Sequence, residues 1–218
     1  MAKYGIIVDL KRCTGCMTCV IACKQENLTR PGVWWNKILE LESEILNRIT
    51  YVRHACMHCE NPPCLHSCPN DAIKQRPDGI VLINQQKCEG AADCVDACPY
   101  GAIDINPDAG YFADQKLPFE EAEEPHRRHP PGKAGSCTLC VHRIDVGQEP
   151  VCVTGCPSKA MIFIDFDNPQ SAIDKKPGIS EAWISSGGTR PKVRYICDQN
   201  LLKTIEKWIR KKPKMTIF

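Results

Sequence analysis

The stretch CTGCMTCVIAC, residues 13–23, places four cysteines within eleven residues. The same crowding recurs in CMHCENPPCLHSC at residues 56–68, in CEGAADCVDAC at 88–98, and in CTLC at 137–140, which VCVTGC at 151–156 completes. These four cysteine groups contain 15 of the 16 cysteines of the 218-residue chain, and only Cys197 stands outside them. What the four groups bind therefore determines what kind of protein this is.

The overall composition is that of a globular protein that does not need disulfides to hold it together. A chain of 218 residues is long enough to bury a hydrophobic core, and 43% apolar residues argue against general disorder. A net charge of +2 excludes a broad basic surface for nucleic acid. No apolar run approaches the roughly 18 residues of a transmembrane helix, and residues 5–8 are too few for the apolar region of a signal peptide. The sequence by itself therefore indicates the cytoplasm, where disulfides are rare and cysteines serve as ligands.

Three kinds of chemistry compete for cysteines spaced in this way. Zinc takes four ligands around one ion, usually as two separate pairs, so the group at 13–23 is too crowded for it. A disulfide framework needs scattered partners and an oxidising compartment. The ferredoxin spacing C-x2-C-x2-C-x3-C holds one iron–sulfur cube with three thiolates and sends the fourth thiolate to a neighbouring cluster. The first group has this spacing, and a proline follows each of the other three, where it starts a turn. We therefore expect iron–sulfur clusters.

Because the fourth thiolate crosses over, the groups are expected to work in pairs. The second and third groups are neighbours, with a hairpin signal at Asp78-Gly79 between them and a strand at 102–105 after them. The first and fourth groups would then form another unit, flanked by strands at 4–8 and 161–165. Spacing leaves the other pairing open, the first group with the second and the third with the fourth. We favour the nested pairing.

The predicted fold is α+β, with two ferredoxin-like two-cluster units, the second nested inside the first, loop insertions and a C-terminal helix. The outer unit and C-terminal extension are expected at 1–50 plus 135–218, and the inner unit at 51–106. A polar, proline-rich surface loop is expected at 107–134, with a partner-docking arm as the alternative. The histidines of that loop, His126 and His129, are expected to be solvated.

The nested arrangement assigns the 15 cysteines to four metal sites. These are site 1 (Cys13, Cys16, Cys19 and Cys156), site 2 (Cys23, Cys137, Cys140 and Cys152), site 3 (Cys56, Cys59, Cys64 and Cys98) and site 4 (Cys68, Cys88 and Cys94). Three histidines near the cysteines either tune a cluster through N–H···S bonds or have packing and surface roles: His54, His58 and His66.

Site 4 lacks one thiolate, because Ala91 stands where the spacing of the third group calls for a second cysteine. An alanine methyl group cannot bind iron. We expect three [4Fe–4S] clusters and one three-cysteine cluster, for which [3Fe–4S] is favoured. The alternatives are a cube completed by water, hydroxide or a carboxylate, and no cluster at all; Asp93 and Asp96 are close in sequence, but neither stands at the vacant position.

Four quoted stretches resemble a known family: YGIIVDLKRCTGCMTCVIACKQEN, CMHCENPPCLHSCPNDAI, CVDACPYGAI and CTLCVHRIDVGQEPVCVTGCPSKAM. They are similar to the four-cluster iron–sulfur subunits of DMSO-reductase-type molybdopterin oxidoreductases, over about residues 4–165. The resemblance implies the nested pairing and an electron relay beside a large catalytic chain that carries molybdenum or tungsten bis-pterin. Ala91 departs from the all-cysteine pattern of the family.

The expected function is single-electron transfer between such a catalytic subunit and an external donor or acceptor, with no catalytic residue in this chain. A membrane quinone-reactive subunit or a soluble redox carrier is expected as a further partner, and nucleic acid is not. The alternatives are the relay subunit of a hydrogenase and a free polyferredoxin. The expected location is cytoplasmic, or periplasmic if a signal-bearing partner exports the chain in folded form.

Overall fold

The computed structural model describes residues 2–43, 48–112, 114–115, 117–118, 127, 129–168, 170, 188–197 and 199–210. It is a mixed structure of short helices and strands, as expected. The elements, in chain order, are β1 (Tyr4–Asp9), α1 (Thr18–Asn27), β2 (Asn36–Ser43), β3 (Arg48–Ala55), α2 (Pro63–Ser67), β4 (Ile73–Gln75), β5 (Val81–Ile83), α3 (Asp93–Ala97), β6 (Asp104–Ile105), β7 (Ala134–Gly135), α4 (Val141–Ile144), α5 (Val151–Thr154), β8 (Met161–Asp165), β9 (Val193–Ile196) and α7 (Gln199–Arg210).

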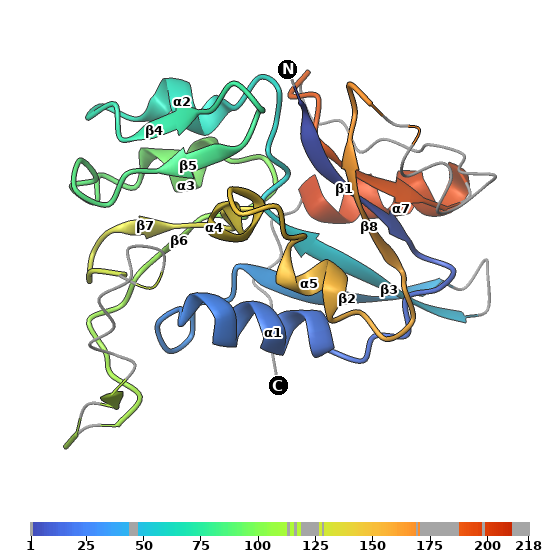
Figure 1. Ribbon diagram of the computed structural model, residues 1–218, viewed down its shortest axis with the longest axis horizontal. Helices are drawn as coiled ribbons and strands as arrows, with labels where there is room; N and C mark the ends of the chain where they lie inside the picture. The colour runs from blue at the N-terminus through green and yellow to red at the C-terminus, as the bar shows by residue number, and fades with distance from the viewer. Residues whose placement is uncertain are drawn as a thin grey trace.

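The largest sheet has three strands in the order β8–β1–β9. Strand β1 pairs antiparallel with β8, with Val8 opposite Met161, and parallel with β9. The sequence predicted β1 and β8 but not β9, which brings a segment from the far end of the chain against the first strand. Helix α7, the expected C-terminal helix, lies beside this sheet (Figure 1) and buries Leu201 and Ile205 in the core.

The longest strands, β2 and β3, form an antiparallel hairpin that the sequence prediction missed. Leu39 and Leu41 are buried while Glu40 and Glu42 are exposed, so the alternation typical of a half-buried strand was present. Strand β3 also spans residue 50, where the boundary between the outer and inner units was expected. The domain ranges stay a prediction.

The hairpin predicted around Asp78-Gly79 is confirmed as β4 and β5. Gly79 has φ +82°, a left-handed conformation that favours glycine, and its N–H donates to the Arg76 carbonyl at 2.8 Å. The helices α2 and α3 pack against each other beside this hairpin (Figure 1). Strand β6 is shorter than the expected 102–105, and it pairs with β7.

The expected surface loop at 107–134 is anchored to the body where the structure describes it. Arg30 Nε donates to the Pro107 carbonyl at 2.8 Å. The expectation that His129 is solvated is wrong: its side chain is buried, it lies edge-on to Trp35, and its Nε2 is 2.6 Å from the Asn27 carbonyl. An aromatic wall and a carbonyl partner compensate the loss of water. Residues 119–126, including His126, lie outside the described residues.

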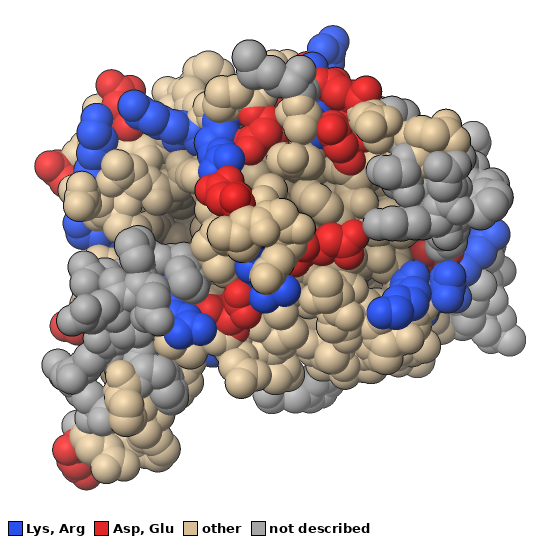
Figure 2. Space-filling view, in the orientation of Figure 1, with Lys and Arg blue, Asp and Glu red and all other residues tan. Residues whose placement is uncertain are grey.

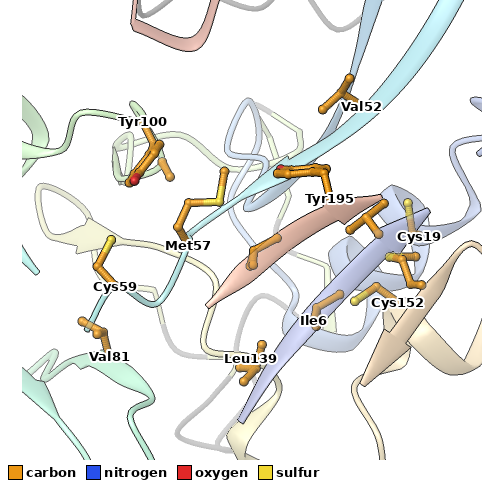
Figure 3. Packing of buried hydrophobic residues seen from close by; sticks show 14 of the residues in the cluster. Ile6, Cys19, Val52, Met57, Cys59, Val81, Tyr100, Leu139, Cys152 and Tyr195 are labelled. Carbon is orange, nitrogen blue, oxygen red and sulfur yellow. The ribbon is translucent and has the colours of Figure 1, made fainter. Parts of the chain in front are cut away.

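A single main core joins all of these elements, and cysteines from all four groups are part of it. In the view of Figure 3 the Tyr195 side chain lies between those of Met57 and Cys19. The Tyr195 hydroxyl donates to the Arg53 carbonyl at 2.7 Å, which ties β9 to β3. On the face shown in Figure 2, Lys and Arg side chains alternate with Asp and Glu, so no broad patch of one sign covers it.

Candidate metal centres

Four thiols line a cavity that α1, α4 and α5 surround. They are the four cysteines assigned to site 2, and they come from chain segments more than a hundred residues apart: Cys23, Cys137, Cys140 and Cys152. Trp35 and Ile6 contribute to a wall that is mostly apolar. The cavity therefore combines four soft sulfur donors with a mostly apolar wall.

A second cavity is lined by the four cysteines assigned to site 1: Cys13, Cys16, Cys19 and Cys156. Unlike the thiols of site 2, one thiol of this site faces solvent, since Cys16 is exposed. The Thr18 hydroxyl lies 3.4 Å from Cys16 Sγ and lowers the pKa of that thiol. Site 1 is therefore more open to the surface than site 2.

The thiols of the second and third groups influence one another electrostatically across the two groups. Besides burial, Cys98 and Cys59 raise the pKa of Cys64, and Cys98 also raises that of Cys56. Burial and the charges of Cys88 and Cys68 raise the pKa of Cys94 to about 11. The last cysteine of each group therefore lies near the first cysteines of the other.

Cysteines assigned to different sites also affect one another electrostatically. Cys152 of site 2 raises the pKa of Cys19 of site 1, after burial, which is the largest cause, and Figure 3 shows these two side chains close together. In the same way Cys137 of site 2 acts on Cys56, and Cys94 of site 4 acts on Cys64. These electrostatic effects thus act between cysteines assigned to sites 1 and 2, to sites 2 and 3, and to sites 3 and 4.

The donor set fits a multi-metal group better than a single ion. Within the described part of the chain, no three His, Cys, Asp or Glu side chains are placed to hold one metal ion. Thiols that surround a cavity suit several irons bridged by sulfide, with one thiolate for each iron. Burial raises the pKa of the Cys19, Cys64 and Cys140 thiols to about 12, so metal binding must displace protons from these sulfurs.

The loops that present the thiols share one backbone feature. In every group, the residue before the second ligand position has a left-handed φ: Gly15 (+69°), His58 (+43°), Gly90 (+81°) and Leu139 (+55°). Such a residue reverses the chain within a C-x2-C segment and brings two cysteines to one side. His58 and Leu139 adopt this conformation although neither is glycine, which indicates that a common ligand geometry imposes it.

The prolines after three of the groups start one recurring turn. In each C-P-x-x-A segment the residue before the alanine has positive φ: Asp71 (+48°), Gly101 (+60°) and Lys159 (+51°). The alanine N–H then points back at the cysteine in two of them, with Ala72 N 3.4 Å from Cys68 Sγ and Ala160 N 3.3 Å from Cys156 Sγ. These bonds hold each cysteine sulfur against the turn that follows it.

After the first group the chain does not turn, because Lys24 replaces the proline and α1 continues to Asn27. The Lys24 ammonium reaches the following loop and donates to three carbonyls, those of Thr29 (2.7 Å), Arg30 (2.6 Å) and Val33 (3.0 Å). Lys24, which stands in place of the proline, therefore anchors the loop after α1, and the sequence did not reveal this role.

The loop around Ala91 keeps the conformation of a ligand loop. Gly90 and Ala92 have φ +81° and +68°, as Gly15 and Met17 have +69° and +61° around Cys16. Ala91 is exposed, like Cys16, and both loops lead directly into a helix. Ala91 therefore occupies the position at which the first group presents its second thiol.

Comparison with known proteins agrees with this donor set. Residues 47–124 and 114–166 match the family model of the 4Fe-4S dicluster domain. The chain is 35% identical over 213 residues to a putative dimethyl sulfoxide reductase iron-sulfur subunit of Halobacterium salinarum, covering 90% of this chain and 79% of that protein. It is 32% identical over 224 residues to the arsenate respiratory reductase iron-sulfur subunit of Shewanella sp., covering 89% of this chain and 96% of that protein.

A third relative, a subunit of the tetrathionate reductase of Salmonella typhimurium, is 36% identical over 175 residues, which are 78% of this chain and 61% of that protein. The chain belongs to the iron–sulfur subunits of molybdopterin oxidoreductases. The expected resemblance is therefore confirmed.

The histidines of this iron–sulfur subunit differ in what they can donate. His58 Nδ1 accepts the Val81 N–H at 3.1 Å, so the proton of the neutral ring sits on Nε2, which has no hydrogen-bond partner within the described residues. Burial lowers the pKa of His58 to about 3, so the ring is neutral. His54 instead uses Nε2 on the Tyr100 carbonyl at 2.8 Å, and His66 is exposed. Of the three histidines, His58 therefore best fits the expectation of an N–H···S bond to a cluster.

Two other features bear on the predictions. Within the described residues of the iron–sulfur subunit, no helix combines the length and the apolar character needed to cross a membrane. Cys197, the cysteine outside the four groups, is half-buried after β9 and lines neither thiol cavity. One residue with a direct bearing on the sites was missed by sequence reasoning altogether: Arg53, a buried cation on β3.

Proposed function

We propose that this iron–sulfur subunit carries single electrons between a catalytic subunit that holds molybdenum or tungsten bis-pterin and an external donor or acceptor. The observation that carries the proposal is the pair of cysteine-lined cavities that share the lining residue Arg53, in a chain that belongs to the iron–sulfur subunits. Closed cubes with one thiolate per iron bind no substrate and change charge by one electron, which suits a relay.

The partner follows from the relatives. The three named above belong to reductases for dimethyl sulfoxide, arsenate and tetrathionate. An iron–sulfur subunit of this kind works beside a catalytic subunit, and we extend that assembly to this chain. A hydrogenase relay and a free polyferredoxin become outcomes of the test.

Purification from native cells under anaerobic conditions tests the partner. The expected result is a large co-eluting chain with molybdenum or tungsten in stoichiometric amount. A monomer that carries iron and sulfide but elutes alone, in the absence of any salt that dissociates complexes, would contradict the proposal and favour a free carrier.

The proposal includes the nested arrangement of two ferredoxin-like units and the ligand sets of sites 1 to 4. Two cavities lined by the cysteines of sites 1 and 2 support it, as do the effect of Cys98 on the pKa of Cys56 and the effects of Cys88 and Cys68 on the pKa of Cys94. The first family-model match, residues 47–124, also contains the second and third groups together.

For site 4 we propose a [3Fe–4S] cluster held by three cysteines. The preserved loop conformation at Ala91 supports it, because the loop has the shape of a ligand loop and lacks only the sulfur. The supporting result is the EPR signal of an oxidised three-iron centre in the isolated protein and about 15 irons per chain, since three cubes and one three-iron cluster are present.

Ala91→Cys is the matched variant. It should abolish the three-iron signal and raise the iron content by about one, because the loop already presents this position as it presents Cys16. A variant with full iron content and an unchanged three-iron signal would refute the assignment.

A further inference from the structure

Arg53 is a charged side chain in the centre of the protein. It lies on β3, is 1% exposed, and is among the largest fully buried side chains of the described residues. An arginine keeps its charge at any ordinary pH, and a buried cation is strongly destabilising unless opposite charge or hydrogen bonds compensate it. The protein must therefore place something beside Arg53 that favours a cation.

The protein partners found for the guanidinium are few. Nε donates to Asn36 Oδ1 at 2.8 Å, and Asn36 in turn donates from Nδ2 to the Cys19 carbonyl at 2.8 Å. Nη1 has no hydrogen-bond partner, and no carboxylate forms an ion pair with Arg53, as far as the described residues show. One amide oxygen is not enough to compensate a full charge.

The position of Arg53 suggests where the compensation comes from. Arg53 lines both thiol cavities, that of site 1 and that of site 2. The guanidinium thus stands between the two sites, because the cysteines of both line the same cavities as Arg53.

The side chain is also held in place by the fold. The Tyr195 hydroxyl, itself buried, donates to the Arg53 carbonyl at 2.7 Å from β9, and Asn36 fixes the guanidinium from β2. Strands from three parts of the chain therefore position one cation. A residue needed only to fill space would not require a charge at this point.

We propose that Arg53 is a positioning residue shared by the clusters of sites 1 and 2: its guanidinium faces both, and Nη1 donates a hydrogen bond to a sulfur of one of them. The inference rests on the proposed function, because it presupposes clusters at these two sites. Positive charge and hydrogen bonds to sulfur both favour the reduced, more negative cluster. Arg53 therefore raises the reduction potentials of two consecutive clusters together and keeps electron transfer between them close to balanced.

The test is an EPR-monitored redox titration of the purified, cluster-loaded protein. Arg53→Gln removes the charge and should make reduction of the clusters at sites 1 and 2 at least tenfold less favourable, which is about 59 mV for one electron. The three-iron signal of site 4 is an internal control and should keep its potential. Arg53→Lys keeps a charge but loses the second nitrogen of the fork, so the same two clusters should shift in the same direction by a smaller factor.

Arg76→Gln is the matched control, because it removes the same charge at the surface, where Arg76 pairs with Asp78 and Asp145 and lines neither cavity. It should leave all four potentials unchanged. If Arg53→Gln assembles its clusters and no potential moves, or all four move equally, the inference is wrong. If that variant cannot hold clusters, unchanged potentials in Arg53→Lys overturn it. Wild-type protein without clusters at sites 1 and 2 would instead refute the proposed function.

Discussion

Replacing Lys24 by methionine tests whether this residue anchors the wall of site 2. The ammonium donates to three carbonyls at 2.6–3.0 Å and lies over the rings of Trp34 (4.9 Å) and Tyr111 (5.5 Å). Methionine has a similar length and helix propensity, so α1 itself should persist. The loop that follows α1 would lose its three hydrogen bonds to the Lys24 ammonium.

The size of the effect follows from these bonds. A hydrogen bond to a charged group contributes about 1.5–3 kcal/mol, but Lys24 is only half-buried and water replaces part of the loss. We therefore expect about 3 kcal/mol for the three bonds together. For a chain of this size that lowers the midpoint of thermal unfolding by about 6–12 °C. Because Val33, Trp35 and Cys23 pack in one small cluster, site 2 should lose its metal first.

The assay is the temperature at which iron is released, followed with a chromogenic chelator under anaerobic conditions. Lys74→Met is the control, since Lys74 is exposed on β4 and its side chain has no hydrogen bond in the described structure. A Lys24→Met midpoint within about 2 °C of both wild type and control would refute the reasoning. Lys24→Pro should be worse than Lys24→Met, because proline inside α1 removes a helix hydrogen bond and costs about 3 kcal/mol or more.

Three further predictions concern other sites. His58→Phe should lower the potential of the site 3 cluster in a redox titration and destabilise the fold by about 1–3 kcal/mol, because it removes a buried acceptor and an N–H donor; an unchanged potential would show that Nε2 does not contact sulfur. Glu26→Gln should cost about 1 kcal/mol at pH 7. Burial raises the pKa of Glu26, but hydrogen bonds from His142 and Arg143 outweigh it and lower that pKa, so the contribution is present above the ordinary pKa of a glutamate and disappears as the pH falls through the lowered value; an iron-release midpoint at pH 7 equal to that of the wild type would contradict this. Gly90→Ala should reduce the three-iron EPR signal and spare the cubes, because the added Cβ would overlap the Gly132 carbonyl at a backbone φ of +81°; a normal three-iron signal would show that the loop adapts.

Some of the fold was accessible from the sequence and some was not, for identifiable reasons. The β4–β5 hairpin was predictable because Asp78-Gly79 is a local turn signal between two short apolar runs. The β2–β3 hairpin carried an alternation signal at Leu39 and Leu41 that was not used. The pairing of strand β9 could not be read from the sequence, since its partner β1 lies almost the whole chain away.

For the loop at 107–134, too, the sequence predicted only part of what the structure shows. Its composition is that of an exposed segment, and the described Phe112 is indeed exposed. His129 is buried nonetheless, because a neighbouring aromatic ring and the end of α1 offer it a partner that only folding creates. Composition predicts the average environment of a segment, whereas a single side chain follows its contacts.

The sequence by itself determined the kind of cofactor and showed the break in the cysteine spacing at Ala91. Both depend on spacings of two or three residues, as between Cys88, Ala91 and Cys94, and such spacings constrain the ligand geometry before any long-range contact forms. Tertiary structure decided which distant thiols become neighbours, such as Cys23 and Cys137, because several pairings satisfy the same spacing. It also decided that Arg53 stands between two cavities, because a strand's position relative to segments more than a hundred residues away depends on packing alone.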